Sequence, residues 1–193
     1  MDRTALGLTA ARDESGALEH LQVLGDRGLR HAEAGGRVAD LLRIEPAGPA
    51  DAGELLTLQR AAYVTEAQLY DDPHLPPLTQ TLDELRADLL TWPTLKAVLG
   101  ARLVGAARAR ADGDVLRIGR LSVAPDLQGR GIGSALLEAV ERLAGPEVRR
   151  AALFTGRRSA ANVRLYERCG YAVTRYEDLP VGPGLVHLEK ELA

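Results

Sequence analysis

A glycine-rich turn at residues 123–134 constrains this chain more than any other feature. The segment reads Val-Ala-Pro-Asp-Leu-Gln-Gly-Arg-Gly-Ile-Gly-Ser. It follows residues 115–123, an aliphatic and β-branched run that is typical of a buried strand. Apolar residues then recur at helical spacing from 136 to 143, and a Gly-Pro pair ends the pattern. The glycines leave the main chain uncovered where the helix begins, so its first N–H groups can bind an anion such as phosphate.

Several unrelated nucleotide sites use turns of this kind, and the neighbouring residues distinguish them. A P-loop requires Lys-Ser or Lys-Thr after its last glycine, but Gly133 is followed by Ser134-Ala135. A dinucleotide-binding turn spaces its glycines as G-x-G-x-x-G, whereas Gly129, Gly131 and Gly133 alternate. Neither site fits, and a merely tight strand-to-helix turn remains the plain alternative.

A second motif follows about 30 residues later along the chain. Residues 151–155 form a short apolar run, and residues 159–171 predict one short helix. Asn162 and Tyr166 are four residues apart on that helix and share a face. Taken in this order, the two motifs resemble the acyl-CoA pyrophosphate loop and the Asn-x-x-x-Tyr helix of the GNAT superfamily of N-acyltransferases.

The resemblance covers residues 41–193 and implies a fold, a cosubstrate and a set of site residues. The implied fold is α+β in three α/β/α layers, with a mixed central sheet whose strands splay apart at the CoA site. The implied cosubstrate is acetyl-CoA, without a metal. By resemblance, the positions that bind it are the backbone near Leu121 and Val123, the loop residues Gln128, Gly129, Arg130, Gly131, Ile132, Gly133 and Ser134, and the side chain of Asn162. Tyr166 would lie near the thioester sulfur and protonate the departing thiolate.

The implied reaction is transfer of an acetyl group to a primary amine, by direct attack of the amine on the thioester. Many members of the family carry a proton-accepting glutamate on the strand before the loop, near the position of Gly119 here. This chain has no carboxylate between Asp114 and Asp126. We expect Gly119 to mark the bulge where the strands part. The base then comes from elsewhere or from a water chain, or is unnecessary because the amine binds neutral.

The acceptor is predicted to be a small or cationic amine. In the resembling family, the segment between the first two helices usually walls the acceptor pocket, and here it contains Tyr70, Asp71, Asp72 and His74. A solvated turn beside Pro73 is the alternative for these residues. Two other functions stay open: acetylation of a protein N-terminus or lysine, and regulatory binding of acyl-CoA without turnover.

Turn residues and apolar periodicity predict the remaining elements. The expected strands are 41–45, 96–99, 103–107, 171–176 and 185–192. One helix should run through Leu55, Leu58 and Ala62, with a capping box formed by Asp51 and Glu54, and a second should begin with a capping box of Thr81 and Glu84. Ser159 is a suitable N-cap for the helix of the second motif. The order β-α-α-β-β-β-α-β-α-β-β is that of the resembling family.

Composition excludes several other classes of protein. The formal net charge of −3 argues against a general nucleic-acid binder. No apolar run is long enough to cross a membrane, and the single cysteine leaves a cytoplasmic location as the default. The expected partners are therefore acyl-CoA and an amine, with a homodimer compatible with the sequence. Residues 1–40 are interrupted by glycines and predict an N-terminal extension, either mobile or one short helix, ahead of the acetyltransferase domain at 41–193.

Overall fold

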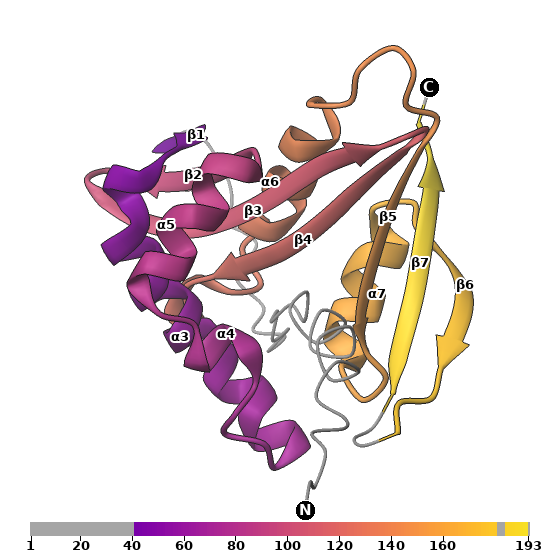
Figure 1. Ribbon diagram of the computed structural model, residues 1–193, viewed down its shortest axis with the longest axis horizontal. Coiled ribbons are helices and arrows are strands. Elements are labelled where there is room, and N and C mark those ends of the chain that lie inside the picture. Colours follow the sequence, from indigo (N-terminus) through magenta and orange to yellow (C-terminus); the bar gives the residue numbers. More distant parts are fainter. Residues whose placement is uncertain (1–40, 181–183, 193) are drawn as a thin grey trace, which may run out of the picture.

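In the computed structural model, which describes residues 41–180 and 184–192, seven strands form one mixed sheet (Figure 1). Their order across the sheet is β1-β2-β3-β4-β5-β7-β6, and only the β4–β5 pair is parallel. The strands are β1 Leu42–Ala47, β2 Thr94–Leu99, β3 Arg102–Asp112, β4 Val115–Val123, β5 Arg150–Gly156, β6 Ala172–Glu177 and β7 Leu185–Glu191. The predicted extension at residues 1–40 lies outside the described residues.

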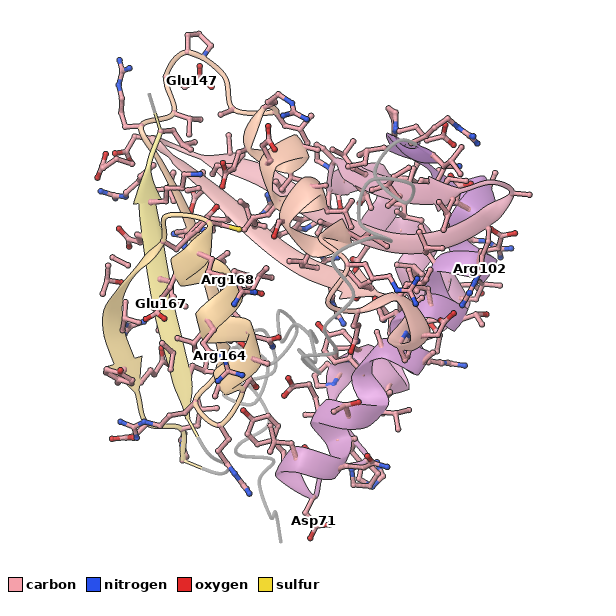
Figure 2. All side chains as sticks on the ribbon, turned by 180° about the vertical axis from the view of Figure 1, so that it is seen from behind. Asp71, Arg102, Glu147, Arg164, Glu167 and Arg168 are labelled. Atoms are coloured by element: carbon pink, nitrogen blue, oxygen red, sulfur yellow. The ribbon has the colours of Figure 1, made fainter. Side chains whose placement is uncertain are left out.

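Helices cover both faces of this sheet, which confirms the predicted three layers. Helices α3 and α5 lie on one face, and α6 and α7 lie on the other (Figures 1 and 2). The helices are α3 Ala52–Tyr70, α4 Pro76–Thr79, α5 Leu82–Thr91, α6 Ile132–Glu141 and α7 Ala160–Arg168. None of the helices within the described ranges is long and apolar enough to span a membrane.

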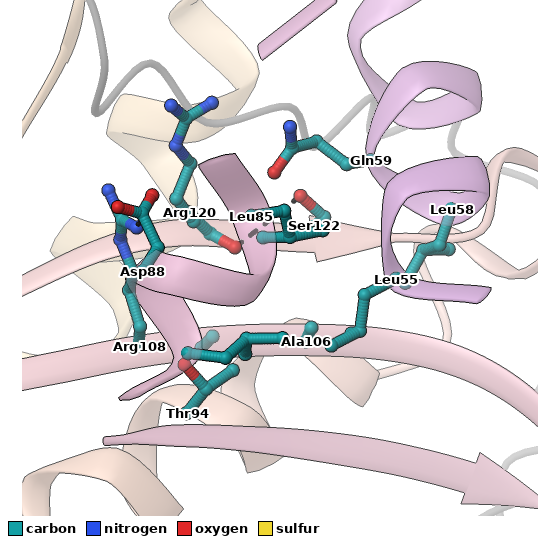
Figure 3. Close-up of a pocket in the computed structure, with 12 residues that line it drawn as sticks. Leu55, Leu58, Gln59, Leu85, Asp88, Thr94, Ala106, Arg108, Arg120 and Ser122 are labelled. Atoms are coloured by element: carbon teal, nitrogen blue, oxygen red, sulfur yellow. Dashed lines mark hydrogen bonds and ion pairs between the residues drawn. The ribbon is translucent and has the colours of Figure 1, made fainter. Parts of the chain in front are cut away.

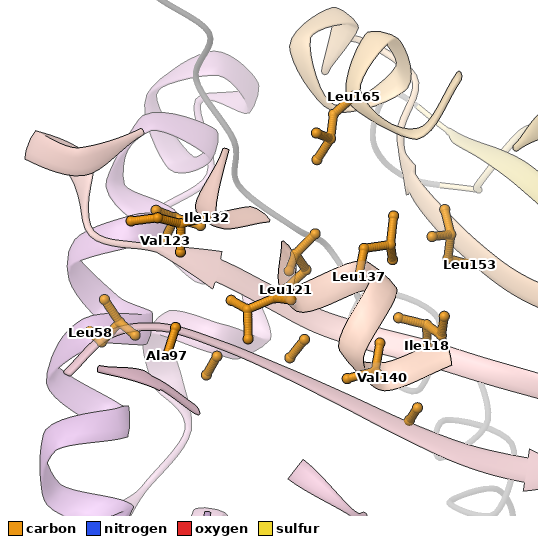
Figure 4. Close-up of a cluster of buried hydrophobic side chains, with 14 of the residues drawn as sticks. Leu58, Ala97, Ile118, Leu121, Val123, Ile132, Leu137, Val140, Leu153 and Leu165 are labelled. Atoms are coloured by element: carbon orange, nitrogen blue, oxygen red, sulfur yellow. The ribbon is translucent and has the colours of Figure 1, made fainter. Parts of the chain in front are cut away.

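The main hydrophobic core lies where β3 and β4 run between these helical layers (Figure 4). Strand β4 is buried at all but one of its nine positions, because helices cover it on both sides. Leu136, Leu137 and Val140 of α6 are completely buried against it. The amphipathic spacing of these residues was the sequence signal for α6, and their burial is what holds the strand-to-helix turn in place.

Strands β4 and β5 separate soon after they begin. They pair only from Val115 to Arg117, with Arg150 to Ala152 as partners. A bulge interrupts the opposite edge of β4, where the register with β3 shifts and Arg120 adopts a left-handed backbone with φ of 53°. The bulge thus lies one residue beyond Gly119, the position predicted for it. The separation of the two strands leaves a gap in the middle of the sheet.

Of the two expected capping boxes, the one formed by Thr81 and Glu84 is present, and the prediction of one formed by Asp51 and Glu54 is wrong. Thr81 Oγ1 accepts from the Glu84 N–H at 3.3 Å, and the Thr81 N–H donates back to Glu84 Oε2 at 2.8 Å. Asp51 makes no such bond to α3. Its carboxylate accepts instead from the Gly48 N–H at 2.9 Å and from Lys96 Nζ at 2.7 Å. The side chain of Asp51 is therefore used to fix the turn before α3 rather than the helix itself.

Candidate active site

The glycine-rich turn opens the backbone at the start of α6. Gly129 and Gly131 have φ of 74° and 84°, values that side-chain-bearing residues rarely adopt. Gly131 is the residue before α6, and no side chain caps the first turn of that helix. A Cβ built on Gly131 meets no atom within 4 Å. The first N–H groups of α6 are thus placed to bind an anion, in the geometry expected of a phosphate site.

The side chains of this turn are placed in different ways. Arg130 is exposed and Ser134 is half-buried, so both can reach a ligand at the turn, whereas Ile132 is buried in the core. The side-chain amide of Gln128 donates to the Val123 carbonyl at 3.3 Å. Gln128 therefore stiffens the turn from inside in this structure, while the neighbouring glycines present the open backbone.

An ion pair neutralises an acidic side chain of the same turn. Asp126 lies three residues before Gly129 and accepts two hydrogen bonds from Arg102, at 2.7 and 2.8 Å. These hydrogen bonds, above all, lower the pKa of Asp126 below its ordinary value. Because Asp126 is matched by Arg102, the exposed Arg130 gives the turn a net positive charge, which suits a phosphate group.

The gap between β4 and β5 continues from this turn. Leu121 and Val123 lie on β4 beyond Arg117, the last residue that pairs with β5. Their side chains are buried on the faces of the sheet, and the β4 edge that faces β5 is left without a ladder in the described part of the chain. An extended ligand can therefore occupy the position of a strand at this edge.

Polar side chains of α3 contact polar side chains of α7 and of the residue before it, across the gap between β4 and β5. On α3, Tyr63, Glu66 and Tyr70 are spaced i, i+3 and i+7, so they share one face. At the start of α7, Ser159, Asn162 and Tyr166 repeat the same spacing. We call these six residues, together with Thr155 of β5, the interhelix cluster.

Hydrogen bonds connect the interhelix cluster from one helix to the other. Ser159 Oγ donates to Glu66 Oε2 at 2.8 Å and lies 2.8 Å from the Tyr70 hydroxyl. The Asn162 amide donates to Glu66 Oε1 at 3.2 Å and to Thr155 Oγ1 at 3.1 Å. The predicted N-cap Ser159 does precede α7, but its hydroxyl makes no capping bond, because Glu66 and Tyr70 engage it.

Glu66 is a buried carboxylate. Only 4% of the residue is exposed. Burial raises its pKa from 4.5 to about 7, and the hydrogen bonds from Ser159 and Asn162 offset part of that rise. A carboxylate with a pKa near neutrality can accept a proton and release it again at physiological pH.

Tyr166 is completely buried beside this carboxylate. Its hydroxyl makes no hydrogen bond to any residue within 41–180 or 184–192. Burial raises the pKa of Tyr166 well above its ordinary value of 10, and the nearby Tyr63, Glu66 and Cys169 raise it further. The hydroxyl is therefore protonated at neutral pH and able to donate. The Tyr63 hydroxyl is buried in the same way.

The four residues predicted to wall the acceptor pocket are divided by the structure. Tyr70 joins the interhelix cluster. Asp71 follows the last turn of α3 and is exposed (Figure 2). Asp72 accepts from the His74 N–H at 2.8 Å, which closes a local turn, and His74 is exposed. Asp71, Asp72 and His74 thus form a local turn that is largely exposed to solvent. Within the described residues, no group of His, Cys, Asp or Glu side chains could hold a metal ion.

Glu66 was missed by the sequence analysis, although a signal for it exists. It is four residues after Ala62 and seven after Gln59, on the face of α3 that is buried. A carboxylate on the buried face of an amphipathic helix is unusual unless it is paired or functional. Extending the helical spacing beyond Ala62 would have found it.

Comparisons with known proteins identify the family and the fold of this chain. The model of the acetyltransferase (GNAT) family matches residues 54–171, more than half of the chain. No curated protein matches the sequence. Among solved structures, the PaiA N-acetyltransferase of Thermoplasma acidophilum in complex with coenzyme A is similar with a TM-score of 0.68 and 17% identity, over 78% of this chain and 99% of that one.

Two further solved structures have a similar fold. The GNAT domain of PAT from S. lividans has a TM-score of 0.62 at 24% identity, over 78% of this chain and 90% of that one. The ribosomal-protein-S18-alanine N-acetyltransferase of Escherichia coli has a TM-score of 0.61 at 16% identity, over 78% and 93%. At these identities the likeness supports the fold alone.

Proposed function

This chain belongs to the acetyltransferase (GNAT) family, an acyl-CoA-dependent class of enzyme, and we propose that it acetylates a primary amine by direct attack on acetyl-CoA. The observation that carries the proposal is the open backbone at the start of α6, next to the gap between β4 and β5. Such a turn binds a pyrophosphate, and the gap takes the extended arm that follows it.

In the proposed complex, each part of acetyl-CoA meets a different part of the site. The pyrophosphate lies at the N–H groups of Gly131 and the residues after it, with Arg130 beside it. The pantetheine arm runs along the edge of β4 at Leu121 and Val123, and Asn162 faces it from α7. This path ends at the interhelix cluster, so the thioester is brought to buried, titratable groups.

We propose that Glu66 and Tyr166 manage the protons of the reaction. The amine nitrogen attacks the thioester carbonyl carbon, a C–N bond forms, and the C–S bond breaks. The proton lost by the amine passes to Glu66, and Tyr166 donates its proton to the departing thiolate and regains one from solvent. Burial of both groups supports these roles, because it leaves Glu66 with a pKa of about 7 and keeps Tyr166 protonated. No covalent enzyme intermediate is required.

Calorimetry with acetyl-CoA and with CoA tests the cosubstrate site. Wild-type protein should bind both ligands in the micromolar range, and Gly131→Glu should abolish the heat by blocking close approach and repelling the pyrophosphate. Gly113→Glu is the matched control. Gly113 also has a positive φ, of 61°, and also has open space around its Cβ position, but it lies in the β3–β4 turn.

The two variants separate binding from folding. Both should lose similar stability, since both place a side chain at a positive φ. Loss of CoA binding in both, or in neither, would remove the phosphate assignment. If acetyl-CoA binds but no amine leads to the formation of free CoA, the regulatory alternative is favoured instead.

A further inference from the structure

A small cavity lies on the face of the sheet that α3 and α5 cover. Its volume is about 30 Å³, the space of one water molecule or one small polar group. Leucines from the two helices form its apolar wall, and its charged lining consists of Arg108, Arg120 and Asp88 (Figure 3). Two guanidinium groups thus share this lining with one carboxylate.

Arg108 is held rigidly at this cavity. Its side chain is 5% exposed, and Nη1 donates to Asp88 Oδ2 at 2.8 Å. Its guanidinium also stacks on the Trp92 ring, with its central carbon 4.7 Å from the ring centroid. Its buried Nε makes no hydrogen bond to any other described residue. A buried, fixed N–H donor without an acceptor is costly unless a ligand completes it.

Arg120 reaches the cavity from the bulge in β4. Its φ of 53° is rare for a residue with a side chain and carries backbone strain. The residue is only 7% exposed, and its side chain extends from β4 toward the same side as that of Arg108 from β3 (Figure 3). An incoming anion would add to the contacts that Arg120 already makes.

The cavity and the interhelix cluster are connected along α3. Gln59 lines the cavity, and Tyr63 and Glu66 follow it by four and seven residues on the same buried face of the helix. At a rise of about 1.5 Å per residue, Glu66 lies about 10 Å along the helix axis from Gln59. An acceptor molecule that spans this distance would present an anion to the arginines and an amine to Glu66.

We propose that the cavity binds the carboxylate of the acetyl acceptor, so that the acceptor is an amino acid or a related amino carboxylate. This inference rests on the proposed function and names the substrate class of the same site. Guanidinium groups match a carboxylate through paired, charge-assisted hydrogen bonds. It differs from the small or cationic amine predicted from Asp71, Asp72 and His74, of which Asp71 and His74 are exposed after the end of α3.

Matched acceptors test this proposal. Wild-type protein is given acetyl-CoA and the common L-amino acids, each beside its uncharged amide and its decarboxylated amine, and CoA release is measured. At least one amino acid should exceed both of its analogues by about tenfold or more in kcat/KM, because a site built for one polar group discriminates against its absence. Phosphoethanolamine is included because guanidinium also binds phosphate. Preference for it, or equal use of acids and amides, would overturn the carboxylate assignment.

Variants locate the preference in the cavity. Arg120→Gln should raise KM for the acid by about tenfold and leave use of the amide within about twofold, and Arg120→Lys should restore part of the difference. Arg117→Gln is the control, since Arg117 lies on the same strand but is exposed and paired with Asp112. An unchanged preference in Arg120→Gln contradicts the inference. Melting curves confirm that each variant is folded.

A binding readout separates this inference from the proposed function. CoA-saturated protein is melted with N-acetyl amino acids and with their amides. Stabilisation by the acids alone, lost in Arg120→Gln, supports the carboxylate site even if no amine is turned over. If the N-acetyl amino acids and their amides stabilise the protein equally and simple amines are acetylated, the proposed reaction is supported and the carboxylate site is contradicted.

Discussion

The Ser159 hydroxyl donates a 2.8 Å hydrogen bond to Glu66 Oε2, although the two residues are 93 positions apart. This bond joins the residue before α7 to the C-terminal part of α3 across the gap in the sheet. It also holds the Glu66 carboxylate in place by a donor that favours its charged form. The same contact is therefore structural and electrostatic, and its two roles can be measured separately.

Glu66→Gln should lower kcat/KM by about 10²-fold, the usual contribution of a general base. In the wild type, kcat/KM should rise with pH through about 7, because the carboxylate accepts a proton only above its pKa. The variant should lose this limb of the profile. Glu167→Gln, on the exposed face of α7, serves as the control for loss of one negative charge (Figure 2). If the rise of kcat/KM near pH 7 persists in Glu66→Gln, another group must cause it.

The same carboxylate should make the fold less stable as pH rises from about 4.5 to about 7. Burial raises its pKa from 4.5 in the unfolded chain to about 7, so the folded state binds more protons than the unfolded state within this window. The loss should approach about 3 kcal/mol at most, at 1.36 kcal/mol per pKa unit. Urea unfolding at pH 4.5 and pH 8 measures it. Glu66→Gln should flatten this dependence, whereas Glu167→Gln should not.

Tyr166→Phe should lower turnover by about 10²-fold and leave acetyl-CoA affinity nearly unchanged. The free energy of unfolding should stay constant or increase by about 1 kcal/mol, because the lost hydroxyl is buried without a hydrogen bond to the described residues. Steady-state kinetics and thermal melting measure the two effects.

Tyr171→Phe is the matched control, since its ring packs edge-on to Tyr166 with centroids 6.1 Å apart. Its hydroxyl donates to Glu141 at 2.7 Å, so this variant should lose about 1 kcal/mol of stability and keep its turnover. Normal turnover in Tyr166→Phe would assign Tyr166 to packing.

Gly156→Ala should destabilise the fold by about 1–3 kcal/mol, the usual range for an overpacked site. An added Cβ would overlap the Tyr70 hydroxyl and lie 2.6 Å from Tyr70 Cζ. The penalty should shrink in a Tyr70→Ala background, where the obstructing ring is absent. A double-mutant cycle in urea gives the coupling. Equal penalties in both backgrounds would show that the backbone at Gly156, and not the ring, restricts the position.

The parts of the fold that were predictable have strong local signals. Strand β4 matches the predicted 115–123, and α6 follows the glycine turn as expected, because apolar spacing and glycine placement act within a few residues. The continuation of α3 to Tyr70 and the short helix α4 were not predicted. Pro76 and Pro77 belong to the segment between the first two expected helices, where no helix was predicted, yet proline is favoured in the first turn of a helix, where its missing N–H is not needed.

The charged part of the site depends on pairings that no local pattern encodes. Arg108 and Arg120 lie on strands that carry other arginines, and no local pattern in the sequence shows that these two are buried. Their burial arises because β4 bulges at Arg120 and because Asp88 and Trp92 arrive from α5 and the residue after it. These contacts join segments about 10 to 20 residues apart or more, and only the assembled sheet brings them together.

Within the described residues, three residue pairs between β4 and β5 make up the strand pairing that joins the two halves of the sheet. The other neighbouring strands pair with each other along most of their length, so the direct connection between the two halves is short by comparison. In the proposed complex, the pantetheine arm would lie along the part of β4 that does not pair with β5. Cosubstrate would then act as a temporary eighth strand, and deuterium uptake by the backbone amides around Leu121 should slow when the arm is seated.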